Sequence, residues 1–101
     1  MAETLKQEAK RFLADVPAEY VFRCHDGRVL QSMKELGNAL NTTTDQTYVF
    51  HANAQKNDFT NWVRDIITDE RLAKDLQHAT NRAQAANLVT GRIAVLSKRL
   101  A

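Results

Sequence analysis

The pair Asp26-Gly27, placed between two short apolar runs, is the feature that most restricts the fold of this chain. The run before it, residues 20–24, is rich in aromatic and β-branched side chains, and the run after it covers residues 28–30. Glycine adopts a positive φ without a clash at Cβ, so an Asp-Gly pair in this setting is a strong signal for a tight turn. The sequence therefore predicts a small two-stranded hairpin.

Helical patterns flank the predicted hairpin. Residues 3–16 carry apolar side chains at the spacing of an amphipathic helix, and Pro17 is expected to end it. After the hairpin, Ser32 and Glu35 form the pattern of a capping box at the start of a second helix. Gly37 weakens that helix by about 1 kcal/mol relative to alanine. The same glycine marks a place where a neighbouring element can approach closely.

The segment 44–51 fits two secondary structures. Residues 48–50, Tyr-Val-Phe, favour a strand, whereas residues 44–46, Thr-Asp-Gln, are typical of a helix start. So few residues show no period that decides between them, and both alternatives stay open. From Asp58 onward the pattern is clearly helical, with a wide apolar face made by Phe59, Trp62, Val63, Ile66 and Ile67.

A long amphipathic C-terminal helix is predicted over about residues 69–100, because only Gly91 and no proline interrupts this stretch. With the other elements it predicts a single domain, 1–101, of the α+β class: mainly helical, with about four helices and one hairpin. A seven-residue apolar repeat runs through the long helix and resembles a weak coiled-coil seam. Its members are Leu72, Ala79, Ala86, Ile93 and Leu100, with Leu76 and Ala83 at the complementary position.

Three interpretations of the long helix remain open. It can fold back on the N-terminal helix of its own chain, or form a homo-oligomer or dock on another protein through its seam. It can also rest on nucleic-acid phosphates through its basic residues, which would give weak and salt-sensitive binding. These basic residues are Arg82, Arg92, Lys98 and Arg99.

The stretch 51–62 concentrates one histidine, three asparagines, one aspartate and the only tryptophan of the chain. Asn57 or Asp58 is well placed to cap the helix that follows, because its side-chain oxygen can accept a free backbone N–H. Phe59 and Trp62 lie three residues apart on one helix face, so both are expected to enter the core. Most of the stretch is therefore explained as a helix start with aromatic anchors.

Capping does not require every polar residue of this stretch. A metal or catalytic site at His51 and Asp58 is one alternative. However, no second cysteine, no His-x₃-His pair and no paired nucleophile accompanies them. We therefore expect no catalytic residue, no metal and no cofactor. A polar surface that contacts a macromolecule is favoured instead, and its candidate residues are His51, Asn53, Lys56, Asn57 and Asp58.

The segment from His51 to Asp65 has the pattern H-x-N-x-x-K-N-D-F-x-x-W-[IV]-x-D, and D-x-x-L-A follows from Asp69. These residues resemble an uncharacterised prokaryotic domain family, common in archaea and found in some bacteria. The resemblance covers about residues 20–76 and implies a compact, mainly helical module with no assigned reaction. It also favours helix over strand near His51. The signature residues that it marks, with no role attached, are His51, Asn57, Asp58, Phe59, Trp62, Asp65 and Asp69.

The expected function is a small non-catalytic interaction or assembly module that binds a protein partner or itself through the C-terminal helix. The alternative is nucleic-acid or ribonucleoprotein binding through the basic helix and the polar cluster at Lys56 and Asn57. A net charge of +2 does not by itself require a polyanionic partner. The lone Cys24 and the lack of a long apolar run indicate a cytoplasmic protein with no membrane partner.

Overall fold

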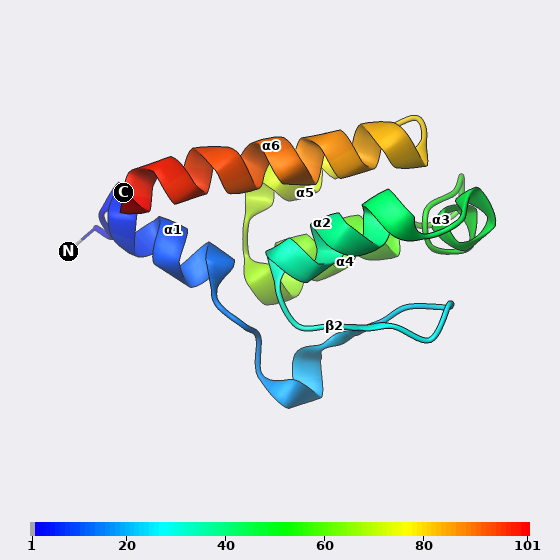
Figure 1. The fold of residues 1–101 in the computed structure, drawn as a ribbon, viewed down its shortest axis with the longest axis horizontal. Coiled ribbons are helices and arrows are strands. Elements are labelled where there is room, and N and C mark those ends of the chain that lie inside the picture. The colour runs from blue at the N-terminus through cyan, green and yellow to red at the C-terminus, as the bar shows by residue number, and fades with distance from the viewer. Residues whose placement is uncertain (1) are drawn as a thin grey trace.

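The structure, a computed structural model, describes residues 2–101 and is mainly helical, with one small sheet at its edge (Figure 1). The elements in sequence order are α1 (Leu5–Leu13), the 3-10 turn η1 (Ala18–Tyr20), β1 (Phe22–Arg23), β2 (Val29–Leu30), α2 (Met33–Thr42), α3 (Asp45–His51), α4 (Asp58–Trp62), the π-helical turn η2 (Val63–Ile67), α5 (Glu70–Gln77) and α6 (Arg82–Leu100). The prediction of a mainly helical α+β fold with a hairpin and a long C-terminal helix is confirmed. The prediction of about four helices is wrong, because residues 2–101 form six α-helices.

The predicted hairpin forms around Asp26-Gly27. Strands β1 and β2 pair antiparallel, with Phe22 opposite Leu30. Gly27 has a φ of +96°, a left-handed conformation that glycine adopts without strain. The backbone N–H of Arg28 donates to the Asp26 carboxylate at 3.0 Å, so the Asp26 side chain stabilises the turn. The prediction of a two-stranded hairpin at this pair is therefore confirmed.

The first two long helices begin at polar caps. Thr4 caps α1 and forms a full capping box with Gln7, while α1 ends at Leu13, earlier than the expected stop before Pro17. The Ser32 hydroxyl accepts from the Glu35 N–H at the start of α2, as predicted. The second half of the predicted capping box is wrong, because the Glu35 carboxylate accepts from the backbone N–H of Gln31, at 2.6 Å.

Segment 44–51 is a helix. Thr44 caps α3, since its hydroxyl accepts from the Thr47 N–H at 3.1 Å. The strand preference of residues 48–50 is overridden by packing: Tyr48 and His51, one helical turn apart, are both buried. The helical alternative is therefore the correct one.

The predicted continuous helix over residues 69–100 is wrong, because a break at residues 78–81 separates α5 from α6. The last turn of α5 tightens, with the Ala79 N–H donating to the Leu76 carbonyl. Asn81 then caps α6 by accepting from the Gln84 N–H at 2.8 Å. The cap restarts the helix in a new direction, so the seven-residue repeat does not form one seam.

Helix α6 lies along α1 and α2, and α5 packs beside it (Figure 1). Gly37 of α2 permits this approach: a Cβ there would lie only 3.3 Å from Cγ1 of Val89. The ion pair between Arg99 and Glu8 joins the far end of α6 to α1 at 3.1 Å. Of the three interpretations of this helix, the structure shows the one in which it packs on its own chain. The buried residues of α6 are Ala85, Ala86, Val89 and Leu96.

Within residues 2–101, no helix is both long enough and apolar enough to cross a lipid bilayer.

Candidate binding site

His51, at the end of α3, joins three separate parts of the protein. Its side chain is buried, and Nε2 lies 2.9 Å from the backbone nitrogen of His25 in the hairpin turn. Since Nε2 accepts this N–H, the ring hydrogen of the neutral imidazole sits on Nδ1. Nδ1 then donates to the Asp58 carboxylate of α4, also at 2.9 Å. Both ring nitrogens are thus engaged with protein atoms.

Asn57, not Asp58, is the cap of α4. Its side-chain oxygen accepts from the Thr60 N–H at 3.0 Å, and its amide group donates to the Leu76 carbonyl of α5 at 3.2 Å. Asp58 instead accepts from His51 and from the Lys56 ammonium, the latter at 2.9 Å. Partial burial raises the pKa of Asp58, but the hydrogen bonds from His51 and Lys56 outweigh it and leave the pKa below its ordinary value.

The aromatic anchors bind the hairpin to α4. Phe22 of β1 stacks on Phe59 with ring centroids 5.2 Å apart and meets Trp62 edge-on at 5.7 Å. The Trp62 indole N–H donates to the carbonyl of Tyr20 at 2.8 Å. The prediction that Phe59 and Trp62 enter the core is confirmed.

The remaining two signature residues differ in burial. Asp65 is exposed and pairs with its neighbour Arg64. Asp69 is only 1% exposed, caps α5 through the Leu72 N–H, and binds Arg92 of α6 through both guanidinium contacts, at 2.8 and 3.2 Å. Asp69 therefore fixes the start of α5 to the middle of α6.

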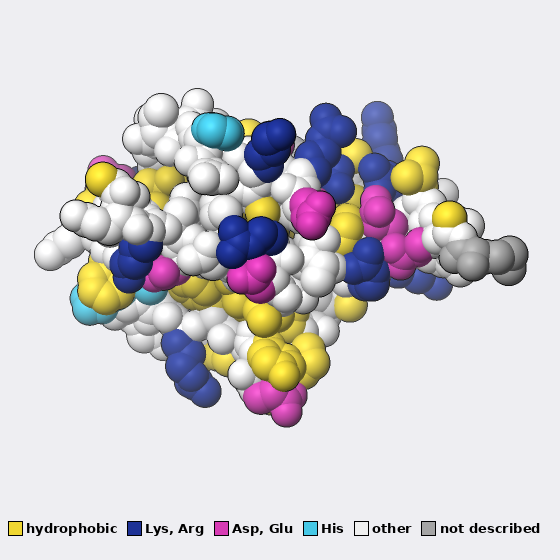
Figure 2. Space-filling model, turned by 180° about the vertical axis from the view of Figure 1, so that it is seen from behind, with side chains coloured by type: hydrophobic (Ala, Val, Ile, Leu, Met, Phe, Trp, Pro, Cys, Tyr) yellow, Lys and Arg dark blue, Asp and Glu magenta, His cyan; other side chains and the backbone are white. Residues whose placement is uncertain are grey.

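The basic residues predicted to form one surface are spread apart. Arg92 is bound to Asp69 and Arg99 to Glu8, while Lys98 has no ion pair within residues 2–101. Arg82 lies at the other end of α6. Figure 2 shows basic and acidic side chains interleaved toward the end of the molecule that carries the N-terminus. The structure does not gather these residues into one basic patch.

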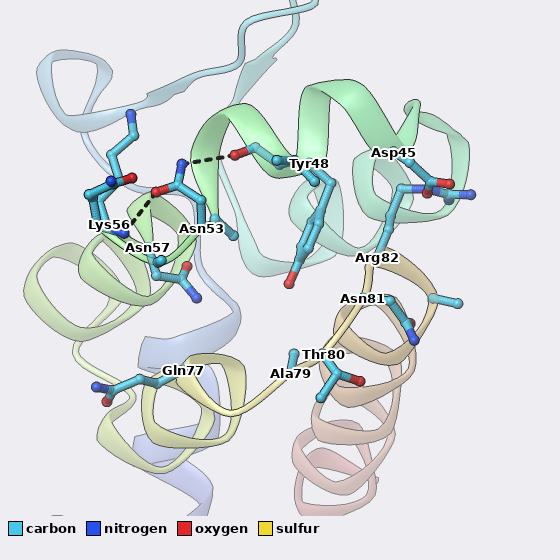
Figure 3. A pocket seen from close by; sticks show the side chains of 15 residues that line it. Asp45, Tyr48, Asn53, Lys56, Asn57, Gln77, Ala79, Thr80, Asn81 and Arg82 are labelled. Carbon is cyan, nitrogen blue, oxygen red and sulfur yellow. Dashed lines mark hydrogen bonds and ion pairs between the residues drawn. The ribbon is translucent and has the colours of Figure 1, made fainter.

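A cavity of about 800 Å³ opens between α3, the loop 52–57, the end of α5 and the start of α6 (Figure 3). Four predicted contact residues line it: Asn53, Lys56, Asn57 and Arg82. His51 and Asp58 are not among the lining residues. Sequence reasoning missed six further polar lining residues: Asp45, Tyr48, Gln55, Gln77, Thr80 and Asn81. The Asn-x-x-Gln cap pattern was a signal for Asn81.

An exposed apolar pair borders the cavity. Val49 lines it and is 56% exposed, and the next residue, Phe50, is 46% exposed. The Phe50 ring stacks on His25 with centroids 3.9 Å apart, and the Lys56 ammonium lies 4.8 Å from the same ring. An aromatic ring held from two sides is fixed in place while part of it still faces solvent.

Comparisons of this protein with family models, with curated proteins and with solved structures found no match. The resemblance of residues 51–65 to a prokaryotic family therefore stays a prediction. Among residues 2–101, no three His, Cys, Asp or Glu side chains are grouped so that they could hold a metal ion. The candidate site accordingly rests on the cavity and its apolar border.

Proposed function

We propose that this protein is a non-catalytic interaction module that docks a partner protein on one surface, the α3 surface. This surface consists of Val49, Phe50, Lys56 and the adjoining cavity. The observation that carries the proposal is the exposure of two consecutive large apolar side chains beside a polar cavity. Protein interfaces combine an apolar, often aromatic, centre with a polar rim. Contiguous apolar exposure of this kind is typical of contact sites.

A non-catalytic role is favoured by the state of His51. It is the side chain in this region best suited to acid–base chemistry, but it is 4% exposed and both its nitrogens bind protein atoms. A catalytic base must reach the proton that it removes. The hydrogen bonds of His51 instead serve to hold the α3 surface in its conformation.

The α3 surface replaces the C-terminal helix as the proposed contact site. The apolar side chains of α6 pack against α1, α2 and α5, which leaves a polar outer face with one large exposed apolar residue, Val95, at 49% exposure. Little apolar area then remains on α6 to stabilise a dimer. Self-association through α6 is kept as the rival outcome of the test.

The test is site-specific photocrosslinking in cells of the native host. A photoreactive phenylalanine analogue replaces Val49 in one variant and Val95 in a second, which serves as the matched control because the two valines have similar exposure. We expect a discrete protein adduct from position 49 that a Phe50→Ser change abolishes, and none from position 95. Adducts only from position 95, above all with a second copy of the protein, would overturn the proposal in favour of α6.

A further inference from the structure

Within the described part of the chain, the Tyr48 hydroxyl is an unpaired hydrogen-bond donor at the cavity. Tyr48 is only 6% exposed, and its ring stacks on Phe59 with centroids 5.7 Å apart. Figure 3 shows the hydroxyl pointing into the cavity, and it makes no hydrogen bond to another group of residues 2–101. The hydroxyl oxygen is open to the cavity and not enclosed, because no enclosed side-chain nitrogen or oxygen among residues 2–101 lacks a hydrogen-bond partner. Burial also raises the pKa of Tyr48, so the hydroxyl keeps its proton.

Helix α6 begins at the same cavity. Asn81, Arg82 and Ala83 line it, and Asn81 already satisfies the N–H groups of Gln84 and Ala85. The N–H groups of Arg82 and Ala83 have no acceptor within residues 2–101. The first N–H groups of a helix attract negative charge because the helix dipole adds to their own. With 19 residues, α6 is long enough for this effect.

Both cationic residues of the lining are already paired with carboxylates, Lys56 with Asp58 and Arg82 with Asp45. Lys56 and Arg82 are cationic, and Asp45 is the single acidic lining residue. Asp45 is bound by the Arg82 Nε at 2.9 Å, and the Arg82 Nη1 donates to the Leu40 carbonyl at 2.8 Å. Nη2 of Arg82 is left without a partner among the described residues.

We propose that the cavity binds a carboxylate of the docked partner, with the Tyr48 hydroxyl and the first N–H groups of α6 as donors. This inference rests on the proposed function, because it names the chemical group that the α3 surface recognises. A phosphate, which carries nearly two charges, is usually held by a cluster of free arginines, and Arg82 is already half occupied. The carboxylate comes from a Glu or Asp residue or from the free C-terminus of the partner.

The test is an NMR titration of the full ¹⁵N-labelled protein with three short peptides. The first is acetyl-Ala-Glu-Ala-amide, the second replaces Glu with Gln, and the third is acetyl-Ala-Ala-Ala with a free C-terminus. We expect the amide signals of Arg82 and Ala83 to shift with the first or the third peptide and not with the second. The tighter of these two binders identifies the source of the carboxylate. Equal binding of the Gln peptide, or no shift with either carboxylate, would overturn the inference.

A conservative variant tests the tyrosine directly. Tyr48→Phe keeps the buried ring and removes only the hydroxyl, so the carboxylate peptide should bind about tenfold more weakly. Tyr20→Phe is the control, because Tyr20 is exposed and does not line the cavity. Unchanged affinity in Tyr48→Phe would remove Tyr48 from the site. An adduct at position 49 without carboxylate binding would refute this inference alone, whereas carboxylate binding without that adduct would refute only the docking surface.

Discussion

The backbone N–H of His25 and the imidazole Nε2 of His51 lie 2.9 Å apart, although 26 residues separate them in the sequence. Through the opposite nitrogen the same ring holds Asp58. The hairpin turn, the end of α3 and the start of α4 are therefore joined by one neutral side chain. The position of Phe50, which stacks on His25, depends on this junction.

Replacing His51 tests the junction. His51→Leu fills a similar volume but leaves the His25 N–H without its acceptor and Asp58 without one of its two hydrogen-bond donors, so the free energy of unfolding should fall by about 2–3 kcal/mol. Urea denaturation measures this loss. His78→Leu is the control: His78 is exposed, and its replacement should change stability by less than about 0.5 kcal/mol. Equal effects of the two changes would contradict the role assigned to His51.

The buried ion pair between Asp69 and Arg92 should be costly to break. Arg92→Met leaves a carboxylate that is 1% exposed without its counter-charge, and the expected loss is about 3–5 kcal/mol. Arg99→Met removes the more exposed pair with Glu8 and should cost no more than about 1 kcal/mol. Chemical denaturation of both variants gives the comparison. A smaller loss in Arg92→Met than in Arg99→Met would show that Asp69 finds another partner.

Acid should weaken the fold partly through Asp58. Its pKa is lower in the folded protein than in the unfolded state, despite partial burial, because of the hydrogen bonds from His51 and Lys56. The unfolded state then binds the proton more readily, so the stability contributed by Asp58 is present above the unfolded pKa, about 3.9. It is lost as the pH falls through the folded pKa.

Denaturation midpoints between pH 6 and pH 3 measure this effect. Asp58→Asn should show a shallower loss of stability toward acid than the natural protein. Asp15→Asn is the control, since Asp15 is exposed and forms no ion pair within residues 2–101. The same pH slope in the Asp58→Asn variant and the natural protein would rule out this contribution.

The two helical glycines should respond differently to alanine. A Cβ at Gly91 of α6 would meet no atom within 4 Å, so Gly91→Ala should stabilise by about 0.5–1 kcal/mol through helix propensity alone. At Gly37 the Cβ would lie 3.3 Å from Val89 and 3.5 Å from Ile93, and crowding should offset most of the same gain. Thermal unfolding of the two variants side by side measures the difference. A larger gain in stability at Gly37 than at Gly91 would mean that Val89 and Ile93 of α6 move aside at little energetic cost.

The sequence predicted correctly those features that depend only on residues close together in the chain. The Asp26-Gly27 turn, the Ser32 cap and the apolar face of Phe59 and Trp62 each follow from residues within one turn of each other. The break before Asn81 also had a local signal, but the seven-residue apolar repeat concealed it. A repeat that continues through a cap does not show whether the helix continues with it.

The composition of the candidate site was only partly predictable. Asn53, Lys56 and Asn57 are close in sequence, but Arg82 joins them only because α6 restarts beside α3. His51 looked like a contact residue, and its true partners, a backbone N–H and a carboxylate on two different elements, follow from tertiary packing. Tyr48 had no signal at all, since its role depends on a cavity that the sequence does not describe.

The packing of α6 across α1 and α2 also determines the order in which the fold can be completed. Arg99 and Glu8 are 91 residues apart, so this contact joins segments far apart in the sequence, and long-range contacts slow folding. During synthesis the part of α2 that packs on α6 stays uncovered until α6 has left the ribosome. The completed fold therefore depends on this late helix, and a polypeptide released before it would expose Leu36 and Leu40 to aggregation.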